Sequence, residues 1–418
     1  MDYRAEVFDQ MQLLYDLTGF NDHQLHCVLR FESRPDGETL RKAVIASIKA
    51  IPILGTRYVS QGGRPRWESI DETRFGDAYI AVRRSAEFDG FVTHRIDETA
   101  GPQVKVCLLD SDNPAIALTM NHMVCDAAGF KEYLYFLCRV YSETMADPGY
   151  EPVPITGDRS MRGVMGKFGP IKRLRSLLRQ GKDNNRSGVF RFPLSEGGDE
   201  RPFILTRKLG RERMEAIKEY CRTHGATVND VALAAFYRCL FRRLALASGI
   251  ELCIPVMIDM RRYLDEEVGF EALTNLSSTA TTCLTHASHE AFTETLRRVK
   301  EVMDEKKGSE MGLNAFIKLN MVYALLPNKL ANLRVQRGLK NPLICMTNIG
   351  ILESERMSFG DLRPHDAFMC GSVKYKPHFQ LAMSSYDGEL TLSSNLYGTA
   401  LDREHILSFL GEVEKEIP

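Results

Sequence analysis

Strand-like and helix-like segments alternate in both halves of the chain, and this alternation constrains the fold more than any other sequence feature. In the first half, an apolar strand pattern at 24–31 precedes apolar residues at helical spacing over 38–50. In the second half, a strand pattern at 203–208 precedes helical spacing over 211–224. Such an order is typical of α/β folds, in which helices cover the faces of a sheet. We therefore predict an α/β protein built from two comparable parts.

The same patterns predict the remaining elements. Short apolar runs bounded by turn residues indicate strands, and apolar residues three or four positions apart indicate helices. The turn Asp387-Gly388 separates two strand patterns and predicts a hairpin. The further strands are expected at 104–109, 115–120, 252–258, 343–347, 380–386 and 389–395, and the further helices at 127–141 and 226–246.

The chain of 418 residues is longer than one hydrophobic core usually serves, so two subdomains are expected. A segment rich in Gly, Pro and basic residues lies between the two halves; between Asp158 and Gly188 it carries nine Lys or Arg and two Asp. We predict an N-terminal subdomain at 1–150, a connection at 151–200 and a C-terminal subdomain at 201–418.

Within the connection, the run 171–179 predicts a short basic amphipathic helix. Three interpretations remain open for it. It is a solvated and partly flexible linker, a contact for an acidic partner such as a carrier protein or a phosphate-bearing thioester, or an attachment to a membrane surface.

Composition argues against a general attraction to nucleic acid or lipid. The formal net charge is −1, with 44% hydrophobic and 26% charged residues, which is ordinary for a globular protein. No apolar run is long enough to cross a bilayer, and the N-terminal residues have mixed charge rather than the pattern of a leader. The sequence predicts a cytoplasmic protein without a transmembrane segment and without nucleic acid as a partner.

The ten cysteines are scattered singly, and most lie in apolar segments. No Cys-x-x-Cys pair is present. This usage predicts reduced core residues rather than a disulfide framework or a zinc site.

His122 and Asp126 lie four residues apart, directly after the predicted strand 115–120 and before the predicted helix 127–141. Junctions of this kind commonly hold catalytic side chains. A histidine is suited to general acid–base catalysis because its ordinary pKa lies near neutrality. The spacing alone is weak, since both residue types are common.

These residues also have other interpretations. His122 and Asp126 could be two metal ligands, but no third ligand follows at metal-site spacing. Cys125 could be a nucleophile, although its apolar neighbour Val124 favours a packed cysteine. Three further histidines have structural alternatives: His286 and His289 decorate or cap the next helix, and His378 lines a tunnel or has a surface or structural role. No phosphate-binding glycine loop or dinucleotide motif is present.

Several short elements, taken in order, resemble the chloramphenicol acetyltransferase-like superfamily of thioester-dependent acyltransferases, which includes condensation domains and alcohol and wax-ester acyltransferases. The signature of that superfamily is His-His-x-x-x-Asp-Gly after a strand, where this chain has Asn121 to Ala127. The agreeing elements span nearly the whole chain: Ile51-Pro52-Ile53-Leu54-Gly55-Thr56-Arg57, Gly101-Pro102-Gln103-Val104, Thr227-Val228-Asn229-Asp230-Val231, Pro255-Val256-Met257-Ile258-Asp259-Met260-Arg261-Arg262 and Thr347-Asn348-Ile349-Gly350.

The resemblance implies two acyltransferase subdomains, each a mixed sheet flanked by helices, that form a V around a central tunnel. It implies that His122 is the general base and that Asp126 is a structural anchor paired with Arg261, with Arg262 as the next choice. Asn348 is implied as an oxyanion donor. No metal and no bound cofactor are expected, and acyl-CoA or an acyl carrier thioester is the co-substrate.

Two positions depart from the superfamily pattern. The first histidine of the signature is Asn121, which leaves the proton-transferring histidine in place. The glycine after the aspartate is Ala127, and Gly129 follows two residues later. An added methyl group there narrows the approach of a thioester, alters the donor or abolishes activity.

The resemblance therefore favours an acyltransferase that moves an acyl group from a thioester to a hydroxyl or amine acceptor. Two alternatives remain open. One is a free-standing condensation-type enzyme whose donor is held on a carrier protein, suggested by the basic run 171–179. The other is a non-catalytic binding protein with a degenerate acyltransferase site.

Overall fold

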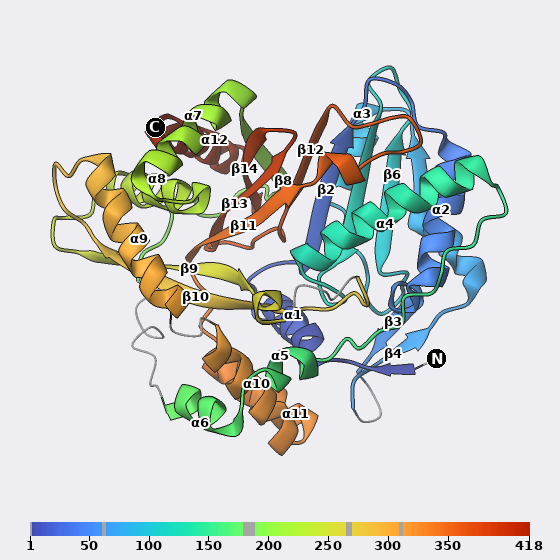
Figure 1. Ribbon diagram of the computed structural model, residues 1–418, viewed down its shortest axis with the longest axis horizontal. Coiled ribbons are helices and arrows are strands. Elements are labelled where there is room, and N and C mark those ends of the chain that lie inside the picture. The colour runs from blue at the N-terminus through green and yellow to red at the C-terminus, as the bar shows by residue number, and fades with distance from the viewer. Residues whose placement is uncertain (1, 61–63, 179–188, 265–269, 309–311) are drawn as a thin grey trace.

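The computed structural model describes residues 2–60, 64–178, 189–264, 270–308 and 312–418. Two lobes, each a sheet with helices on it, lie side by side (Figure 1). The predicted α/β class is confirmed. Arg179, the last residue of the predicted basic helix, and the rest of the basic stretch to Gly188 lie outside the described residues.

The first lobe contains a sheet of five strands in the order β12-β2-β7-β6-β5. Alternation along the strands sends one set of side chains to the core under α2 and α4, and the other set to a smaller core under α3. A small sheet in the order β1-β4-β3 lies beside it. The bounds are β1 Asp2–Arg4, β2 Gln24–Arg30, β3 Thr56–Val59, β4 Arg66–Ser69, β5 Tyr79–Val82, β6 Val104–Leu109, β7 Ala115–Asn121, β12 Asp366–Cys370, α2 Gly37–Ala50, α3 Ser85–Val92 and α4 Ala127–Ala146.

The second lobe contains a sheet of six strands in the order β10-β9-β11-β13-β14-β8. Helices α7, α8, α9 and α12 surround a second large core with this sheet (Figure 1). The bounds are β8 Arg201–Leu209, β9 Glu251–Asp259, β10 Ser277–Thr285, β11 Ile344–Leu352, β13 Phe379–Tyr386, β14 Glu389–Gly398, α7 Arg211–His224, α8 Val228–Arg243, α9 Phe292–Gly308 and α12 Ala400–Glu416.

A fourth core, smaller than the two large ones, lies where both lobes meet a group of helices at the lower edge of Figure 1. It includes Val7 from α1, Phe168 from the connection and Phe316 from α10. The bounds are α1 Val7–Leu17, α5 Arg162–Gly166, α6 Pro170–Leu178, α10 Leu313–Leu325 and α11 Asn328–Gly338, and the 3₁₀ turns are η1 Pro52–Gly55, η2 Glu72–Ala78, η4 Met260–Tyr263 and η5 Ser354–Arg356. No helix in the described ranges is long and apolar enough to cross a bilayer.

One strand of the first lobe comes from late in the chain. After β11 the chain leaves the second sheet and forms β12, which pairs antiparallel with β2, and it then returns as β13. The segment between β12 and β13 therefore passes from one lobe to the other. The subdomain bounds 1–150 and 201–418 stay a prediction. The strand β12 lies in the later half of the sequence but belongs to the five-stranded sheet of the first lobe.

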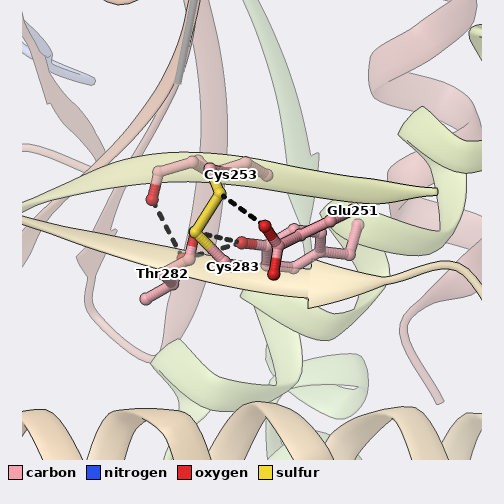
Figure 2. Close-up of a disulfide and its surroundings, with 6 residues drawn as sticks. Glu251, Cys253, Thr282 and Cys283 are labelled. Carbon is pink, nitrogen blue, oxygen red and sulfur yellow. Dashed lines mark hydrogen bonds between the residues drawn. A yellow bond between two sulfur atoms is a disulfide. The ribbon is translucent and has the colours of Figure 1, made fainter. Parts of the chain in front are cut away.

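The prediction that all cysteines are reduced is wrong at two positions. β9 and β10 pair antiparallel, and their register sets Cys253 directly opposite Cys283. Their sulfur atoms form a disulfide (Figure 2). Sequence reasoning missed this bond because the partners lie 30 residues apart and only the strand register brings them together. The other eight cysteines are free and buried, as predicted.

We expect the unfolded, unreduced protein to react with eight equivalents of a thiol reagent, and with ten after reduction. The change from Cys253 to Ser should leave one new reactive thiol at Cys283, whereas the change from the free Cys221 to Ser should remove one. Thiol titration in denaturant measures each number. Ten reactive thiols before reduction would contradict the bond.

Candidate active site

His122 lies directly after β7, at the edge where the first lobe faces the second. The backbone N–H of His122 donates to the carbonyl of His23 at 2.9 Å, which continues the pairing of β7 with β2 by one residue. Four residues on, Asp126 is the N-cap of α4, and its carboxylate accepts the N–H of Gly129 at 3.0 Å. A buried strand and a capped helix thus fix both ends of the five-residue segment 122–126.

Asn275 fixes the tautomer of His122. The side-chain amide of Asn275 donates to the carbonyls of His122 and Met123 at 2.8 and 3.0 Å. The amide oxygen therefore faces Nδ1 of His122, 3.2 Å away. An oxygen can only accept, so Nδ1 carries the proton. The other ring nitrogen, Nε2, keeps its lone pair and has no hydrogen-bond partner in the described part of the chain.

The electrostatic surroundings favour the neutral form of His122. Burial lowers the pKa of the ring, and the ammonium of Lys374 adds to this effect. The backbone carbonyl of His122, the carboxylate of Asp126 and Asn275 act in the opposite direction but do not cancel it. A histidine with a lowered pKa is unprotonated at neutral pH and can accept a proton.

The structure brings Asp126 and Arg261 together. Arg261 lies in the turn η4 after β9, and its Nη1 donates to Oδ2 of Asp126 at 2.8 Å. The same oxygen accepts the N–H of Leu276 at 2.7 Å. Burial by itself raises the pKa of Asp126, but Arg261 and the N–H groups of Gly129 and Leu276 outweigh it, so the pKa lies below its usual range. The ionised pair joins the His122 segment to the second lobe.

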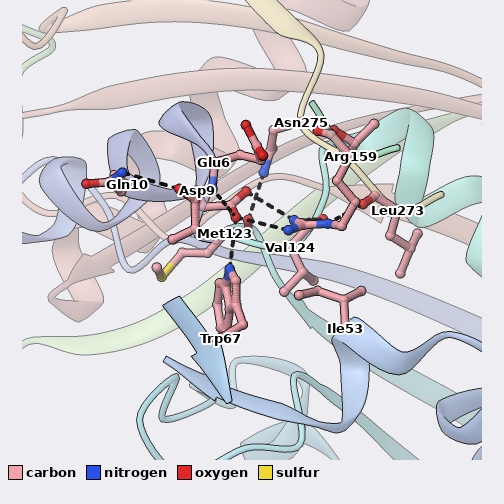
Figure 3. Close-up of polar contacts among 12 residues, drawn as sticks. Glu6, Asp9, Gln10, Ile53, Trp67, Met123, Val124, Arg159, Leu273 and Asn275 are labelled. Atoms are coloured by element: carbon pink, nitrogen blue, oxygen red, sulfur yellow. Dashed lines mark hydrogen bonds and ion pairs between the residues drawn. The ribbon is translucent and has the colours of Figure 1, made fainter. Parts of the chain in front are cut away.

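A second buried ion pair, between Asp9 and Arg159, also contacts this segment (Figure 3). Asp9 in α1 is 1% exposed. Its carboxylate accepts hydrogen bonds from both Nη atoms of Arg159 at 3.1 Å and from the indole N–H of Trp67 at 2.9 Å. Arg159 also donates to the carbonyl of Val124 at 3.1 Å and to that of Leu273 at 2.8 Å. The connection between the lobes therefore supplies a residue that fixes the backbone between His122 and Asp126.

The two departures from the signature have clear structural settings. Asn121 is fully buried, donates from its amide to Gln103 at 2.6 Å and accepts the N–H of Met123 at 2.9 Å. It stabilises the start of the loop. Ala127 is the first residue of α4 and is partly buried against the first core. Gly129 cannot be exchanged freely, since an added Cβ would lie 2.8 Å from the Cβ of Cys125.

In the described part of the chain, no hydrogen bond joins Asn348 to His122. The amide of Asn348 donates to Asn229 at 3.3 Å, and its oxygen accepts the N–H of Gly350 at 2.9 Å. It lines a cavity of about 380 Å³ together with Asp259 and Arg262. His122 lines neither this cavity nor a second one of about 250 Å³ beside Arg159. The oxyanion role of Asn348 and the central tunnel therefore stay predictions.

The remaining candidates are placed as follows. Cys125 is fully buried, and burial raises the pKa of its thiol, which suits a packed cysteine rather than a nucleophile. Nδ1 of His286 donates to the carbonyl of Leu246 at 2.8 Å, before α9, and His289 lies in the turn that follows His286, with a positive φ of 60°. His378 is buried between the lobes rather than on the surface.

The chemistry of the cluster around His122 does not suit a metal. Asp126 is engaged by a guanidinium and two N–H groups, and His122 directs an N–H toward Asn275. Within the described ranges, the one group of three side chains close enough to share an ion is Glu251, Cys253 and Cys283, and its two sulfurs are bonded to each other. Acid–base chemistry at Nε2 is what this arrangement supports.

Sequence reasoning missed Asn275, Arg159 and Asp9. Asn275 follows an apolar stretch and carries no charge, so no pattern distinguishes it from a loop asparagine. Asp9 and Arg159 lie 150 residues apart, and each alone resembles an ordinary surface residue. The signal that could have found Asp9 is its place on the apolar face of a helix pattern at 7–14.

The Asn275→Asp variant tests the tautomer. A carboxylate keeps an acceptor for Nδ1–H but adds a negative charge, so the pKa of His122 should rise. We expect the acid limb of the pH–rate profile to move to higher pH. The Asn275→Leu variant should lower kcat by about tenfold to a hundredfold, the effect of leaving a polar group unpaired. A pH–rate profile that is the same in the parent and in Asn275→Asp would contradict the contact.

Neither protein-family models nor curated protein sequences match the chain, but solved structures do. Polyketide synthase associated protein 5 from Mycobacterium tuberculosis matches with 14% identity and a TM-score of 0.67, covering 98% of this chain and 97% of that chain. Trichothecene 15-O-acetyltransferase from Fusarium sporotrichioides matches with 13% identity and a TM-score of 0.71, over 100% and 95% of the two chains. The first condensation domain of the CDA synthetase matches with 14% identity and a TM-score of 0.69, over 100% and 96%.

These matches cover nearly the whole of each chain, so both lobes are matched together. The identities are too low to carry over a substrate, but the folds agree throughout. The neighbours are condensation domains, an acetyltransferase and a polyketide-synthase-associated protein. The chain has the fold of these condensation domains and this acetyltransferase, which is the fold that the resemblance to the chloramphenicol acetyltransferase-like superfamily implied.

Proposed function

We propose that the protein is an acyltransferase that moves an acyl group from a thioester to a hydroxyl or amine. The observation that carries this proposal is the tautomer of His122: Nδ1–H is held by Asn275, and Nε2 is left as an unpaired base between two lobes of an acyltransferase fold. The chemistry of thioesters suits this site, because acyl transfer from a thioester needs one group that first accepts and then returns a proton.

The proton and the acyl group follow one path. Nε2 of His122 takes the proton of the acceptor as its oxygen or nitrogen attacks the thioester carbonyl. The carbon–sulfur bond of the resulting tetrahedral adduct then breaks, and the same nitrogen returns the proton to the leaving thiolate. The anchors Asp126 and Arg159 do not touch the reacting atoms. They hold the ring and its loop.

Release of free thiol tests the proposal. The protein is mixed with acyl-CoA and acyl-pantetheine thioesters of increasing chain length, with and without alcohols and amines, and the product is identified by mass spectrometry. We expect thiol release that depends on an acceptor and on His122. Equal release by the parent and by the His122→Ala variant would reject the catalytic role and favour the alternative of a non-catalytic binding protein.

The second candidate is a condensation-type reaction with a carrier-bound donor. Helix α6 exposes Ile171 and Leu174 at 69% and 56%, and Lys172 and Arg175 are exposed beside them. An apolar pair rimmed by positive charge suits an acidic protein surface. This arrangement supports the partner interpretation of the basic segment, and the condensation domains among the similar structures are consistent with it.

Charge reversal distinguishes a carrier from free coenzyme A. The paired change of Lys172 and Arg175 to Glu should weaken transfer from an acyl carrier protein at least tenfold and leave transfer from the matching acyl-CoA unchanged. The same reversal at Lys218 and Arg222, exposed on α7, is the matched control. Equal rates with carrier-bound donor for both paired variants would reject α6 as the docking site.

A further inference from the structure

Lys374 is a buried cation in the segment that passes from β12 to β13, between the two lobes. Its residue is 3% exposed. Its backbone bridges both sides, since Lys374 pairs with Asn21 of the first lobe and with Leu396 of β14. Asn21 lies two residues before His23, whose carbonyl accepts the N–H of His122. Backbone pairing therefore places Lys374 beside the segment that leads to His122.

The ammonium of Lys374 has no acceptor within the described ranges. Its Nζ lies over the ring of Phe20, 4.1 Å from the centroid, and makes no hydrogen bond or ion pair there. Burial lowers the pKa of this lysine, as expected for a cation that is removed from water. Buried ammonium groups are normally paired, because an isolated one is costly.

The side chains that face Lys374 neutralise it only in part. They are Asp22, Cys345, His122 and His378. Burial raises the pKa of Asp22 to about 7, so this carboxyl group is only partly ionised at neutral pH. Burial also raises the pKa of the Cys345 thiol and lowers the pKa values of both histidines, which leaves all three neutral.

His378 adds a second unused polar atom to the same place. It is 8% exposed and packs edge-on against Phe20, with the ring centroids 5.0 Å apart. Its Nδ1 contacts the carbonyl of Pro342 at 2.9 Å, so Nδ1 carries the proton. Nε2 has no partner in the described part of the chain. Lys374 and His378 thus flank one aromatic ring, each with a polar group left over.

We propose that Lys374 is the binding group for a carboxylate carried by one of the two substrates, in a subsite completed by Phe20 and His378. This inference rests on the proposed acyl transfer at His122 and specifies its substrate class. A single buried ammonium without an acceptor suits one carboxylate, which forms a charge-assisted hydrogen bond with it. The phosphates of a thioester donor lie a whole pantetheine arm away from the reacting carbonyl. The carboxylate therefore belongs to the acceptor or to the acyl chain.

Substrate pairs that differ only in this charge test the subsite. The acceptor arm uses ω-hydroxy and ω-amino acids of increasing length, each against its methyl ester. The donor arm uses succinyl- and glutaryl-CoA against butyryl- and valeryl-CoA. The parent should prefer the acid in one arm, with an optimum length set by the separation of Lys374 from His122. Equal kcat/KM for acid and ester at every length in both arms would overturn the inference.

The Lys374→Met variant then assigns the preference to this residue. At a pH on the plateau above the acid limb, where His122 is neutral with or without this ammonium, we expect its KM for the preferred acid to rise at least tenfold and its kcat/KM for the neutral partner to fall much less. Lys374→Arg should keep part of the preference. Lys218→Met, on the surface of α7, controls for net charge. A parallel loss for acid and ester would show a merely structural lysine, and the melting temperatures of all variants are measured alongside.

A binding measurement separates the two proposals. Calorimetry with the His122→Ala protein and the same acids, including glutarate, needs no turnover. One outcome would reject acyl transfer and keep the subsite. In it, the His122→Ala protein binds the acid, the His122→Ala/Lys374→Met protein does not, and the parent releases no thiol from any thioester. Acyl transfer without any dependence on Lys374 would reject the subsite and keep the transferase.

Discussion

The His122→Ala variant should lose about a hundredfold to ten-thousandfold in kcat/KM for acyl transfer, the usual contribution of a general base. The loss should appear in kcat, because the proton is transferred only in the transition state. The melting temperature should change little, since the ring makes one side-chain hydrogen bond, to Asn275, and Asp126 keeps its partners. Steady-state kinetics and thermal unfolding measure the two effects.

His224→Ala is the matched control. His224 is an exposed histidine on α7 whose Nδ1 contacts a carbonyl in its own helix, so its loss should leave kcat unchanged. A His122→Ala protein that retains more than a tenth of the parent rate would show that another group moves the proton.

The pH–rate profile of the parent follows from the same site. Because burial lowers the pKa of His122 and only the neutral ring accepts a proton, activity should fall as the pH falls through a value below about 6.5, the ordinary histidine pKa. An acidic substrate bound at Lys374 would offset the effect of that ammonium on His122. The acid limb should then lie at higher pH for the acid than for its ester.

Local patterns predicted the elements that build the edge of the first lobe where His122 lies. The strand 104–109 and the helix 211–224 have the predicted bounds. The strand β7 ends directly before His122, and α7 follows β8 in the second lobe, as the apolar periodicity predicted. The predicted helix 127–141 extends to Ala146 as α4, because no helix-breaking residue follows Tyr141 before Asp147. Amphipathic periodicity is a local property, so sequence alone reveals it.

The features that sequence could not predict depend on pairing between distant segments. β12 joins β2 across more than three hundred residues, and the disulfide depends on the register of β9 with β10. Asn275 reaches His122 only because Asp126, through its ion pair with Arg261 and the N–H of Leu276, draws the segment before β10 against the loop. No pattern in a single sequence reports such contacts. Among them, only the pairing of Arg261 with Asp126 was predicted, and it came from the resemblance to the superfamily.

Removing Arg261 should destabilise the protein by about 3 kcal/mol, because it leaves the buried carboxylate of Asp126 with only two N–H donors. Arg261→Met should therefore unfold at lower urea concentration and lose activity, although His122 is unchanged. The matched double variant Asp126→Leu/Arg261→Met buries no charge and should recover much of the stability but not the activity. Arg262→Met, in the same turn, is the control.

The pH dependence of that loss identifies its cause. The pKa of Asp126 is lower in the folded protein than in the unfolded chain, so the ion pair contributes fully above about pH 4 and its contribution disappears as the pH falls through the lower, folded value. The difference in unfolding free energy between the parent and Arg261→Met should therefore be largest near neutrality and shrink below about pH 4. A difference that stays constant from about pH 7 to about pH 3 would assign the loss to packing by the arginine side chain. It would then leave the orientation of His122 to Asn275 and Arg159, which contact the same loop without involving Asp126.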